Sequence, residues 1–554
     1  MALGGGTFLV QNKVLPGAYI NFISVAQASA TLSDRGIVTI PLAMNWGPEG
    51  KIFTVEQADF IKNSQKIFGY AYTADELKPM REIFLHAKTV HFFRLGTSGV
   101  KAANTYATAK YPGTRGNDLR TVITANENTT EQKPLFDVAT FLGTVQVDLQ
   151  EGVAAITGLK ANDYLDWKSS GTLSLTASLP LTGGTNGTVA DSDYQTYLDQ
   201  AEAYTFNAMG CTESKATITA LFAAFAKRMR DDVGKKFQVV LFRKLADYEG
   251  VVSVKNGLTS DKTSTALIPW VTGVIGGTAV NKSATNMAYD GEYDVDTDFT
   301  QTQLENGIRE GSFMFHRVDE AVCVLTDINS FISITDEKSS DFSSNQTIRV
   351  LDQIANDIAV LFGKKYLART AAIWATWFFV NFSYYGAFTW MPSLLADQFG
   401  SLTKSFGYTL AIAIAQLPGY FLAAWLVEIW GRRKTLSVFL AVSAVAAFAF
   451  SQAGSVAAVL GFGMLLSASN LGAWGVLYAV TPEIYPTRLR GAASGAAAAC
   501  GRVAAIIAPL LMPWFLTLSG GNKAVAFIVF AVAFILACVA ALCLPERTGK
   551  ELED

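Results

Sequence analysis

Residues 364–379 read KKYLARTAAIWATWFF, and the chemical character of the chain changes within this stretch. From Arg369 to the last residue the chain carries 11 Lys and Arg and 7 Asp and Glu, whereas residues 1–368 carry 33 and 40. Charged residues are therefore roughly a tenth of the later part and roughly a fifth of the earlier one, a difference typical of membrane-embedded against soluble chain. We expect two differently solvated parts, with net charges of +4 and −7 that together give the −3 of the whole chain.

The average composition excludes several classes of protein. Half of the 554 residues are hydrophobic and the mean hydropathy is +0.26, which excludes a disordered chain, a collagen and a basic nucleic-acid-binding tail. Five Cys in a chain of this size exclude a disulfide scaffold. The N-terminal MALGGGTFLVQNK has no basic-then-apolar signal, which argues against secretion.

Beyond the junction, the chain has six apolar blocks of roughly bilayer-spanning length. We predict an all-α bundle of six transmembrane helices at roughly 370–392, 407–429, 435–451, 455–480, 492–518 and 523–544. If Arg369 is cytoplasmic, eight cations lie on the cytoplasmic side and only Lys404 and Lys523 lie outside. The positive-inside rule then places both ends of this bundle in the cytoplasm of an inner-membrane protein.

The composition of the apolar blocks predicts close contacts between the helices. They are rich in Ala and Gly, as in GAASGAAAACG at 491–501, which allows helices to approach each other closely. Arg502 falls inside the fifth block, where a charge facing lipid is costly. We expect it to face a solute pathway or the bundle interior, or else to extend to the membrane interface. Glu428 is interpreted as an interfacial ion-pair partner.

Before the junction, no apolar run is long enough to span a bilayer. Residues 265–280 are interrupted by Pro and Gly and predict a buried strand or short helix at most. Alternation predicts strands at 36–40 and 172–176, and apolar spacing predicts a helix at 216–229 that ends in cations. The pattern indicates an α+β fold, with turn-rich segments bracketing an inserted β domain at about 98–182.

No catalytic, cofactor-binding or metal-binding constellation emerges from this part. His86, His91 and His316 lack any local nucleophile motif and are interpreted as core or surface residues. The glycine-rich stretches at 96–101 and 183–188 have the wrong spacing or lack the lysine of a phosphate-binding loop. The acidic run at 290–298 is interpreted as a solvated hairpin face rather than a calcium site, because it lacks the EF-hand glycine and closing glutamate.

A series of motifs runs in order through the first 362 residues. They are LPGAYI (15–20), DRG (34–36), NWGP (45–48), VHFFRLG (90–96), AKYPGTRGNDL (109–119), TGGTNGT (182–188), AVNKSATNMAYDGEYDV (279–295), FTQTQLENGIREGSFMFHRVDEAVCVLTDINSF (299–331) and SSNQTIRVLDQIANDIAVLF (343–362). Together they resemble the contractile tail sheath proteins of phages and phage-derived bacteriocins of Gram-positive bacteria. The resemblance covers nearly all of residues 1–365.

This resemblance implies a domain organisation and a mechanical function without enzymatic activity. It implies a subtilisin-like α/β domain without protease activity at 26–97 and 183–342, a β-sandwich at 98–182, and a truncated start of the C-terminal domain at 343–367. An N-terminal arm at 1–25 would lend a strand to a neighbour, and we place its assembly residues at Pro16, Gly17 and Tyr19. Subunits of the family stack around a tail tube and contract without nucleotide or metal. Sheath subunits and the tube are the implied partners, in the cytoplasm or a virion tail, with no nucleic acid.

The loops of the later part resemble the second half of a major facilitator superfamily transporter of the sugar-porter or organic-ion type. The matching motifs are GRRK (431–434), PEIYPTRLRG (482–491), GR (501–502) followed by AP (508–509), and PERTGKELE (545–553). The resemblance covers residues 370–554 and omits the first six helices of that family. It implies gating, packing and pathway roles for Gly431, Arg432, Arg433, Glu483, Pro486, Arg488, Arg490, Gly491, Arg502, Pro545 and Glu546.

No linker separates the two parts: an ordinary domain boundary falls in a flexible stretch of Pro, Gly or polar residues, but here KKYL passes directly into ARTAAIWATWFF. We therefore expect a splice, an assembly error or a deliberate chimera rather than an evolved fusion. The predicted chain is a truncated sheath subunit joined to half a transporter, inactive as a whole because alternating access needs two repeats. The alternatives are a transporter of a small sugar or organic ion, and a membrane-anchored contractile injection component.

Overall fold

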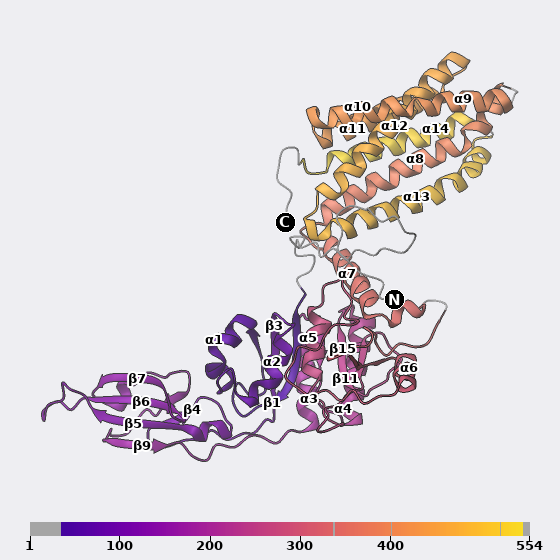
Figure 1. Cartoon of the computed structure of the whole chain (residues 1–554). Coiled ribbons are helices and arrows are strands. Elements are labelled where there is room, and N and C mark those ends of the chain that lie inside the picture. The colour runs from indigo at the N-terminus through magenta and orange to yellow at the C-terminus, as the bar shows by residue number, and fades with distance from the viewer. Residues whose placement is uncertain (1–34, 336–337, 400–401, 521, 547–554) are drawn as a thin grey trace, which may run out of the picture.

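The computed structural model describes residues 35–335, 338–399, 402–520 and 522–546. A sheet-containing part and a helical bundle form separate bodies, and helix α7 (Asn345–Leu361) lies between them (Figure 1). The predicted N-terminal arm, with Pro16, Gly17 and Tyr19, lies outside the described residues.

A seven-stranded sheet organises the first body, in the order β13-β12-β11-β10-β1-β3-β2. Its pairs are parallel except β2 with β3. The predicted strand at 36–40 is the start of β1, whose Val38 pairs with Val90 of β3 and with Ala208 of β10. The strands are β1 (Ile37–Ala43), β2 (Ile52–Glu56), β3 (Thr89–Leu95), β10 (Ala208–Gly210), β11 (Gln238–Phe242), β12 (Val251–Val254) and β13 (Ser312–Phe313).

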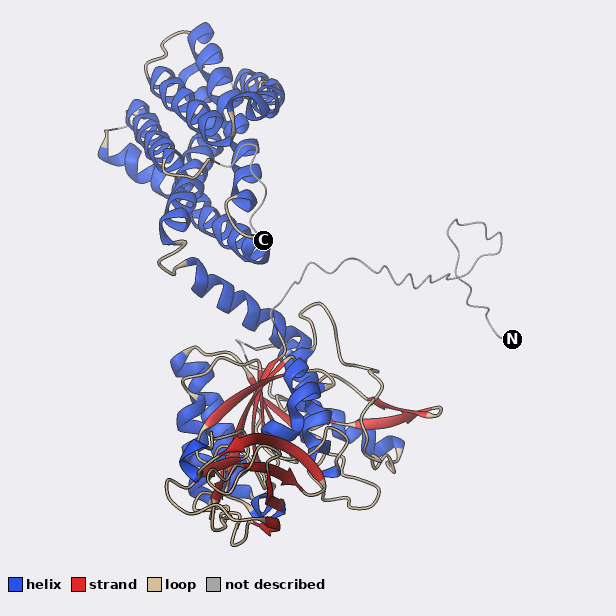
Figure 2. Cartoon of the chain, turned by 90° about the vertical axis from the view of Figure 1, so that its left-hand side faces the viewer, coloured by secondary structure: helices blue, strands red, loops and turns tan. Residues whose placement is uncertain are grey.

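Helices cover both faces of this sheet, as Figure 2 shows. Successive side chains of β11 belong to two different hydrophobic cores, one on each face of the sheet. Val240 packs with α2 and α5, whereas Val239 and Leu241 pack with α3 and α4. When a parallel sheet is covered on both faces, the sequences of its strands are apolar almost throughout, as that of β11 is. The helices are α1 (Gln57–Phe68), α2 (Lys78–Phe84), α3 (Asp191–Ala201), α4 (Ala216–Arg228), α5 (Ile268–Gly277) and α6 (Gln301–Arg309).

Two helices of this body match their predictions closely. The segment predicted at 216–229 is α4, with Lys227 and Arg228 in its last turn. The segment at 265–280 holds the short buried helix α5. The mixed fold of helices and strands is as predicted, whereas its likeness to subtilisin remains a prediction.

A second group of strands lies apart from the main sheet. It contains a four-stranded antiparallel sheet, β7-β6-β5-β9, and the pair β4-β8. A further hairpin, β14-β15, follows β13. The bounds are β4 (Ala107–Ala109), β5 (Leu119–Ala125), β6 (Phe136–Leu142), β7 (Val145–Val153), β8 (Leu165–Trp167), β9 (Thr176–Pro180), β14 (Phe315–Val318) and β15 (Ala321–Val324).

The strand predicted at 172–176 is wrong. Pairing with β5 begins only at Thr176, and the strand β9 runs from there to Pro180. The alternation predicted Leu173 and Leu175 on one buried face, but Leu173 is buried and Leu175 is 65% exposed. The preceding residues therefore pass through a loop that buries one leucine alone.

The predicted hairpin face at 290–298 is also wrong, because no named strand lies in this segment. Its acids make separate contacts. Asp290 accepts a hydrogen bond from Trp270 Nε1 at 2.8 Å, Glu292 forms a two-point ion pair with Arg81, and Asp296 is buried. Local side-chain pairing therefore replaces the strand geometry that the alternation suggested.

The bundle contains long helices at all six predicted places. The second predicted block is bent at Ala415, three residues before Pro418, whose ring interferes with the preceding turn. The helices are α8 (Leu367–Phe399), α9 (Leu402–Ile414), α10 (Gln416–Trp430), α11 (Arg432–Ser451), α12 (Val456–Glu483), α13 (Arg490–Leu518) and α14 (Lys523–Leu542).

Among the described residues, five helices are long and apolar enough to cross a membrane, counting the bent Ser405–Trp430 as one. The predicted count of six is therefore not confirmed. The remaining long helix, α8, has 33 residues and contacts both α13 and α14, but its Trp, Tyr, Thr and Asn residues lower its average hydropathy.

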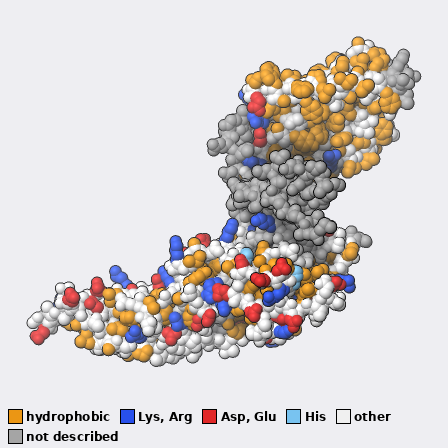
Figure 3. Space-filling view, in the orientation of Figure 1, with side chains coloured by type: hydrophobic (Ala, Val, Ile, Leu, Met, Phe, Trp, Pro, Cys, Tyr) orange, Lys and Arg blue, Asp and Glu red, His pale blue; other side chains and the backbone are white. Residues whose placement is uncertain are grey.

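Close packing of small residues joins the helices, as predicted. A Cβ added to Gly472 of α12 would overlap Phe439 of α11, and one added to Gly419 of α10 would overlap the backbone of Ala468. In the predicted 491–501 segment, only every fourth residue, Ala493, Ala497 and Gly501, is buried. Apolar side chains dominate the visible surface of this body, while charges are scattered over the sheet-containing part (Figure 3).

Candidate functional site

A set of polar contacts closes one end of the bundle, where four chain segments meet. We call it the loop collar, and its described members are Arg369, Arg432, Arg433, Glu483, Tyr485, Arg490 and Glu546. Its strongest contact joins Arg432 to Glu483 by two hydrogen bonds, of 2.9 and 3.2 Å, so that the start of α11 is tied to the end of α12.

The turn between α10 and α11 positions these arginines. Gly431 has φ of +86°, a conformation that side chains disfavour, and it ends α10 directly before Arg432. The backbone N–H of Arg433 donates to Glu546 Oε2 at 3.3 Å, and its side chain donates to the Leu544 carbonyl at 3.5 Å. Pro545 lies between these two acceptors, so the segment that follows α14 also joins the collar.

The turn between α12 and α13 supplies the remaining contacts. Pro486 precedes a short 3-10 turn (Thr487–Leu489), and Arg490 donates to the Tyr485 carbonyl at 3.2 Å. Tyr485 in turn hydrogen-bonds Thr370 of α8 at 3.0 Å, and Arg369 donates to the Ile484 carbonyl. The collar therefore also fixes the start of α8.

The other predicted residues of this turn are placed as follows. Gly491 faces open space, and the side chain of Arg488 lies outside the described residues.

Arg502 lies apart from the collar, near the middle of α13, and its side chain is exposed. No hydrogen bond or ion pair joins it to another residue in the part of the chain that the structure describes. The preceding residue, Gly501, packs directly on Asn381 and Trp377 of α8. Arg502 therefore lies on an open face of the bundle beside α8, and a pathway role stays a prediction.

The structure brings together an aromatic cluster that the sequence analysis missed. It consists of Trp377 and Tyr384 of α8 and Trp474 and Tyr478 of α12. Ring centroids of Trp377 lie 5.8 Å from Trp474 and 4.9 Å from Tyr478, both edge to face. Tyr384 lies 5.9 Å from Trp474. The spacing of Trp474 and Tyr478, one helical turn apart, was the available signal.

Several buried polar atoms on the same helices lack a hydrogen-bond partner among the described residues. They are Nε1 of Trp374, Nε1 of Trp474 and both amide atoms of Asn470. By contrast, Trp377 Nε1 donates to Thr481 Oγ1 at 2.9 Å, and Asn381 donates to the Trp377 carbonyl. Unpaired donors beside aromatic faces are suited to a small ligand with aromatic and polar groups.

The histidines of the sheet-containing part occupy separate structural positions. His86 contacts Asp290 and packs edge to face on Trp270. His91 contacts Thr54, and burial lowers the pKa of its imidazole. Burial also raises the pKa of the Cys211 thiol to about 12, which makes it a poor nucleophile. In the described ranges, no group of three or more His, Cys, Asp or Glu side chains is arranged to hold a metal ion.

Family models match the chain in four consecutive segments. Residues 35–95 match the "Tail sheath protein Gp18 domain III N-terminal region", and residues 97–186 match the "Phage tail sheath protein beta-sandwich domain". Residues 187–330 match the "Phage tail sheath protein central domain". Residues 326–554 match "Sugar (and other) transporter".

Curated and solved relatives support the sheath assignment of the first part. The chain is 34% identical over 389 residues to phage-like element PBSX protein XkdK of Bacillus subtilis, covering 64% of this chain and 81% of that protein. A sheath tail protein of Desulfitobacterium hafniense is 39% identical, with a TM-score of 0.56 over 63% of this chain and 84% of that one.

The later part is similar to the niacin transporter NiaP of Acinetobacter baylyi, at 43% identity over 194 residues. That match covers 35% of this chain and 44% of the transporter, so the chain spans less than half of this relative. The chain therefore belongs to the phage tail sheath protein family, and its later part is similar to less than half of a transporter.

Proposed function

We propose that this protein is a tail sheath subunit, truncated within its C-terminal domain and held on a membrane by half of a secondary transporter. The main observation in support is that three sheath-family matches follow one another in order over residues 35–330 and that the apolar bundle comes after them. In this proposal residues 1–25 are the assembly arm, with Pro16, Gly17 and Tyr19. The α/β core is 26–97 with 183–342, the β-sandwich is 98–182, and 343–367 begins the C-terminal domain.

The partners follow from the two parts. Further sheath subunits and a tail tube would contact the sheath part, and the bilayer would surround residues 368–554. No nucleic acid, metal, cofactor or enzymatic step is required, because contraction of a sheath draws on energy stored in its assembly. The excess of cations in the collar and adjoining loops favours a cytoplasmic position for both ends of the bundle.

We infer that the whole chain is inactive both in contraction and in transport. A sheath subunit without its C-terminal arm loses a strand-exchange partner, and a half-transporter lacks the second repeat of an alternating-access mechanism. Fractionation tests the arrangement: the full chain should remain in membranes after an alkaline carbonate wash, and residues 1–367 expressed alone should be soluble. Purification of the full chain as a monomer without detergent would contradict it.

The junction can be tested independently of the protein. Long sequencing reads from source DNA across the codons for residues 355–380 would show whether the two parts are continuous in the genome. A break in these reads would support a splice or assembly artefact. Uninterrupted coverage would favour the membrane-anchored contractile component instead.

A second candidate function is recognition of a small aromatic carboxylate or related organic solute. The observation that favours it is the aromatic cluster together with the unpaired donors of Trp374 and Trp474. Gly501, which precedes Arg502, packs on Trp377 of this cluster. The transporter relative is named for niacin, which has both an aromatic ring and a carboxylate. Quenching of tryptophan fluorescence by nicotinate should saturate, and Arg502→Gln should weaken it about tenfold. Transport into vesicles that depends on Arg502 would overturn the inactive assignment.

A further inference from the structure

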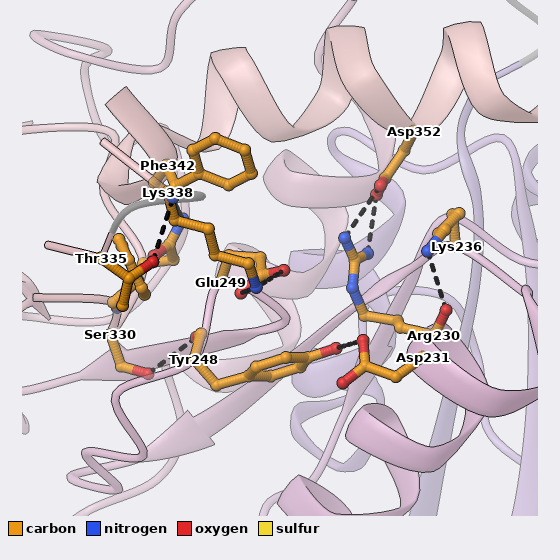
Figure 4. Close-up of polar contacts among 12 residues, drawn as sticks. Arg230, Asp231, Lys236, Tyr248, Glu249, Ser330, Thr335, Lys338, Phe342 and Asp352 are labelled. Atoms are coloured by element: carbon orange, nitrogen blue, oxygen red, sulfur yellow. Dashed lines mark hydrogen bonds and ion pairs between the residues drawn. The ribbon is translucent and has the colours of Figure 1, made fainter. Parts of the chain in front are cut away.

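Helix α7 buries its polar face and exposes its apolar one, the reverse of an ordinary surface helix. Asp352 receives two hydrogen bonds from Arg230, of 2.7 and 2.8 Å, and both side chains are almost fully buried (Figure 4). Arg349 pairs with Asp327 at 2.5 Å, with 1% of each side chain exposed. Asn345 accepts from Gln238 at 2.7 Å. The polar face is therefore fixed against the sheath core.

The opposite face carries a row of apolar side chains that we call the α7 stripe: Leu351, Ile354, Ile358 and Phe362. Their spacing of three and four residues places them on one side of the helix. Leu351 is 40%, Ile354 42% and Phe362 48% exposed. Described helices cover only part of this row: α13 approaches α7, and Phe362 contacts α8, whereas Leu351 and Ile354 remain exposed.

The stripe is continuous with the surface of the bundle. Phe362 packs edge to face on Trp374 of α8, with centroids 5.2 Å apart. Leu361 is buried in the bundle core, and its carbonyl accepts from Thr370 Oγ1 at 2.9 Å. The turn between α7 and α8 exposes two cations, Lys364 and Lys365. Apolar residues and lysines thus adjoin each other in the sequence where α7 leads into α8.

We propose that the α7 stripe lies in the interface of an anionic phospholipid leaflet, with Lys364 and Lys365 on the lipid phosphates. An apolar face of this kind with adjacent cations is the chemistry of an interfacial helix. The bundle brings the helix to the bilayer, so the proposal rests on membrane insertion of residues 368–554. The sheath core then lies against the membrane surface, oriented by the buried ion pairs of α7.

A photocrosslinker distinguishes lipid from every other occupant. The full chain with Ile354→p-benzoylphenylalanine is reconstituted in phosphatidylglycerol and phosphatidylcholine vesicles and irradiated. A lipid adduct, detected by mass spectrometry, is expected. A covalent dimer would show that a second copy covers the stripe, and absence of any adduct would show that water does; both results overturn the proposal.

Two further positions make the result specific. Val360 is 38% exposed on the same helix but lines a cavity of about 450 Å³ with Lys235 and Gln353, so its benzoylphenylalanine variant should give little lipid adduct. Val445 of α11 is 67% exposed and should give abundant adduct once the bundle is inserted. Failure at Val445 refutes membrane insertion itself, whereas failure at Ile354 with success at Val445 refutes the interfacial helix alone.

The lysines provide the electrostatic test. In the Ile354 crosslinking variant, the double change Lys364→Gln and Lys365→Gln should lower the lipid adduct about fivefold or more in phosphatidylglycerol-rich vesicles. In pure phosphatidylcholine the same double change should have little effect. Equal adduct yields with and without the lysines in anionic vesicles would contradict the proposed contacts between these lysines and the lipid phosphates.

Discussion

The sheath part and the bundle place their large apolar side chains in opposite ways. In the sheath part Trp46 and Trp270 are at most 1% exposed, whereas in the bundle Phe421 is 78%, Leu510 72% and Trp425 62% exposed. Figure 3 shows the same contrast between the two bodies. Burial follows the solvent: apolar side chains leave water in one part and face lipid in the other. The exposed tryptophans of the bundle are thus evidence about its surroundings rather than defects.

Charged groups show the complementary contrast. The sheath part buries charges in close pairs, such as Arg230 with Asp352. The bundle instead gathers most of its described charges in or near the collar and leaves Arg502 as the exception. Since an unpaired charge in lipid is costly, a solute pathway beside Arg502, or extension of its side chain to the membrane interface, stays a prediction.

The largest effect should come from truncating a buried tryptophan of the sheath part. Trp270→Ala should destabilise the sheath part by about 3–5 kcal/mol, because its indole is fully buried and donates to Asp290. Phe421→Ala, a comparable change on the bundle surface, should cost less than about 0.5 kcal/mol. Thermal unfolding of the detergent-solubilised full chain measures both. Similar losses of stability in the two variants would show that the two parts do not differ in how they use their large apolar side chains.

The next largest effect tests the buried ion pair. Asp352→Ala leaves the guanidinium of Arg230 buried without its carboxylate, which should cost about 3 kcal/mol or more. The matched control is Asp163→Ala, which removes an ion pair to Lys66 whose side chains are both over half exposed and should change stability by less than about 1 kcal/mol. Urea unfolding followed by fluorescence compares them, and equal losses would contradict the distinction.

The sequence predicts elements better than it predicts contacts between them. Alternation located β1 and apolar spacing located α4, because both patterns reflect one buried face. The strand predicted from alternation at 172–176 was wrong, because alternation does not reveal whether a partner strand is present. The aromatic cluster joins Trp377 to Trp474 across 97 positions, and such packing depends on how α8 and α12 lie together. The loop residues Arg432 and Glu483 were identified singly, but their pairing required the fold.

A smaller effect is expected at the collar. Arg432 and Glu483 are each between a fifth and a third exposed, so their ion pair is partly solvated. Glu483→Gln should lower bundle stability by about 1 kcal/mol, and the change should shrink in 0.5 M salt because screening weakens the native pair. Thermal unfolding in detergent at two salt concentrations measures this. A loss that does not respond to salt would indicate a packing role instead.

The smallest effect concerns a buried carboxylate of the sheath part. Burial, followed by the nearby carboxylates of Glu292 and Asp290, raises the pKa of Glu82, although it accepts hydrogen bonds from Tyr289 Oη and the Glu292 N–H. An acid whose folded pKa is raised binds its proton more tightly when folded. Its contribution to stability is therefore present at acidic pH and decreases as pH rises through its unfolded and then its folded pKa.

Glu82→Gln keeps the shape of this side chain and removes its charge. The variant should be less sensitive to pH than the parent between pH 4 and 8, with its relative gain in stability appearing on the alkaline side. Glu305→Gln, in an exposed ion pair with Arg309, is the control and should leave the pH profile unchanged. Parallel profiles for parent and Glu82→Gln would show that Glu82 is ionised at no cost, and that its hydrogen bonds offset the desolvation of its carboxylate.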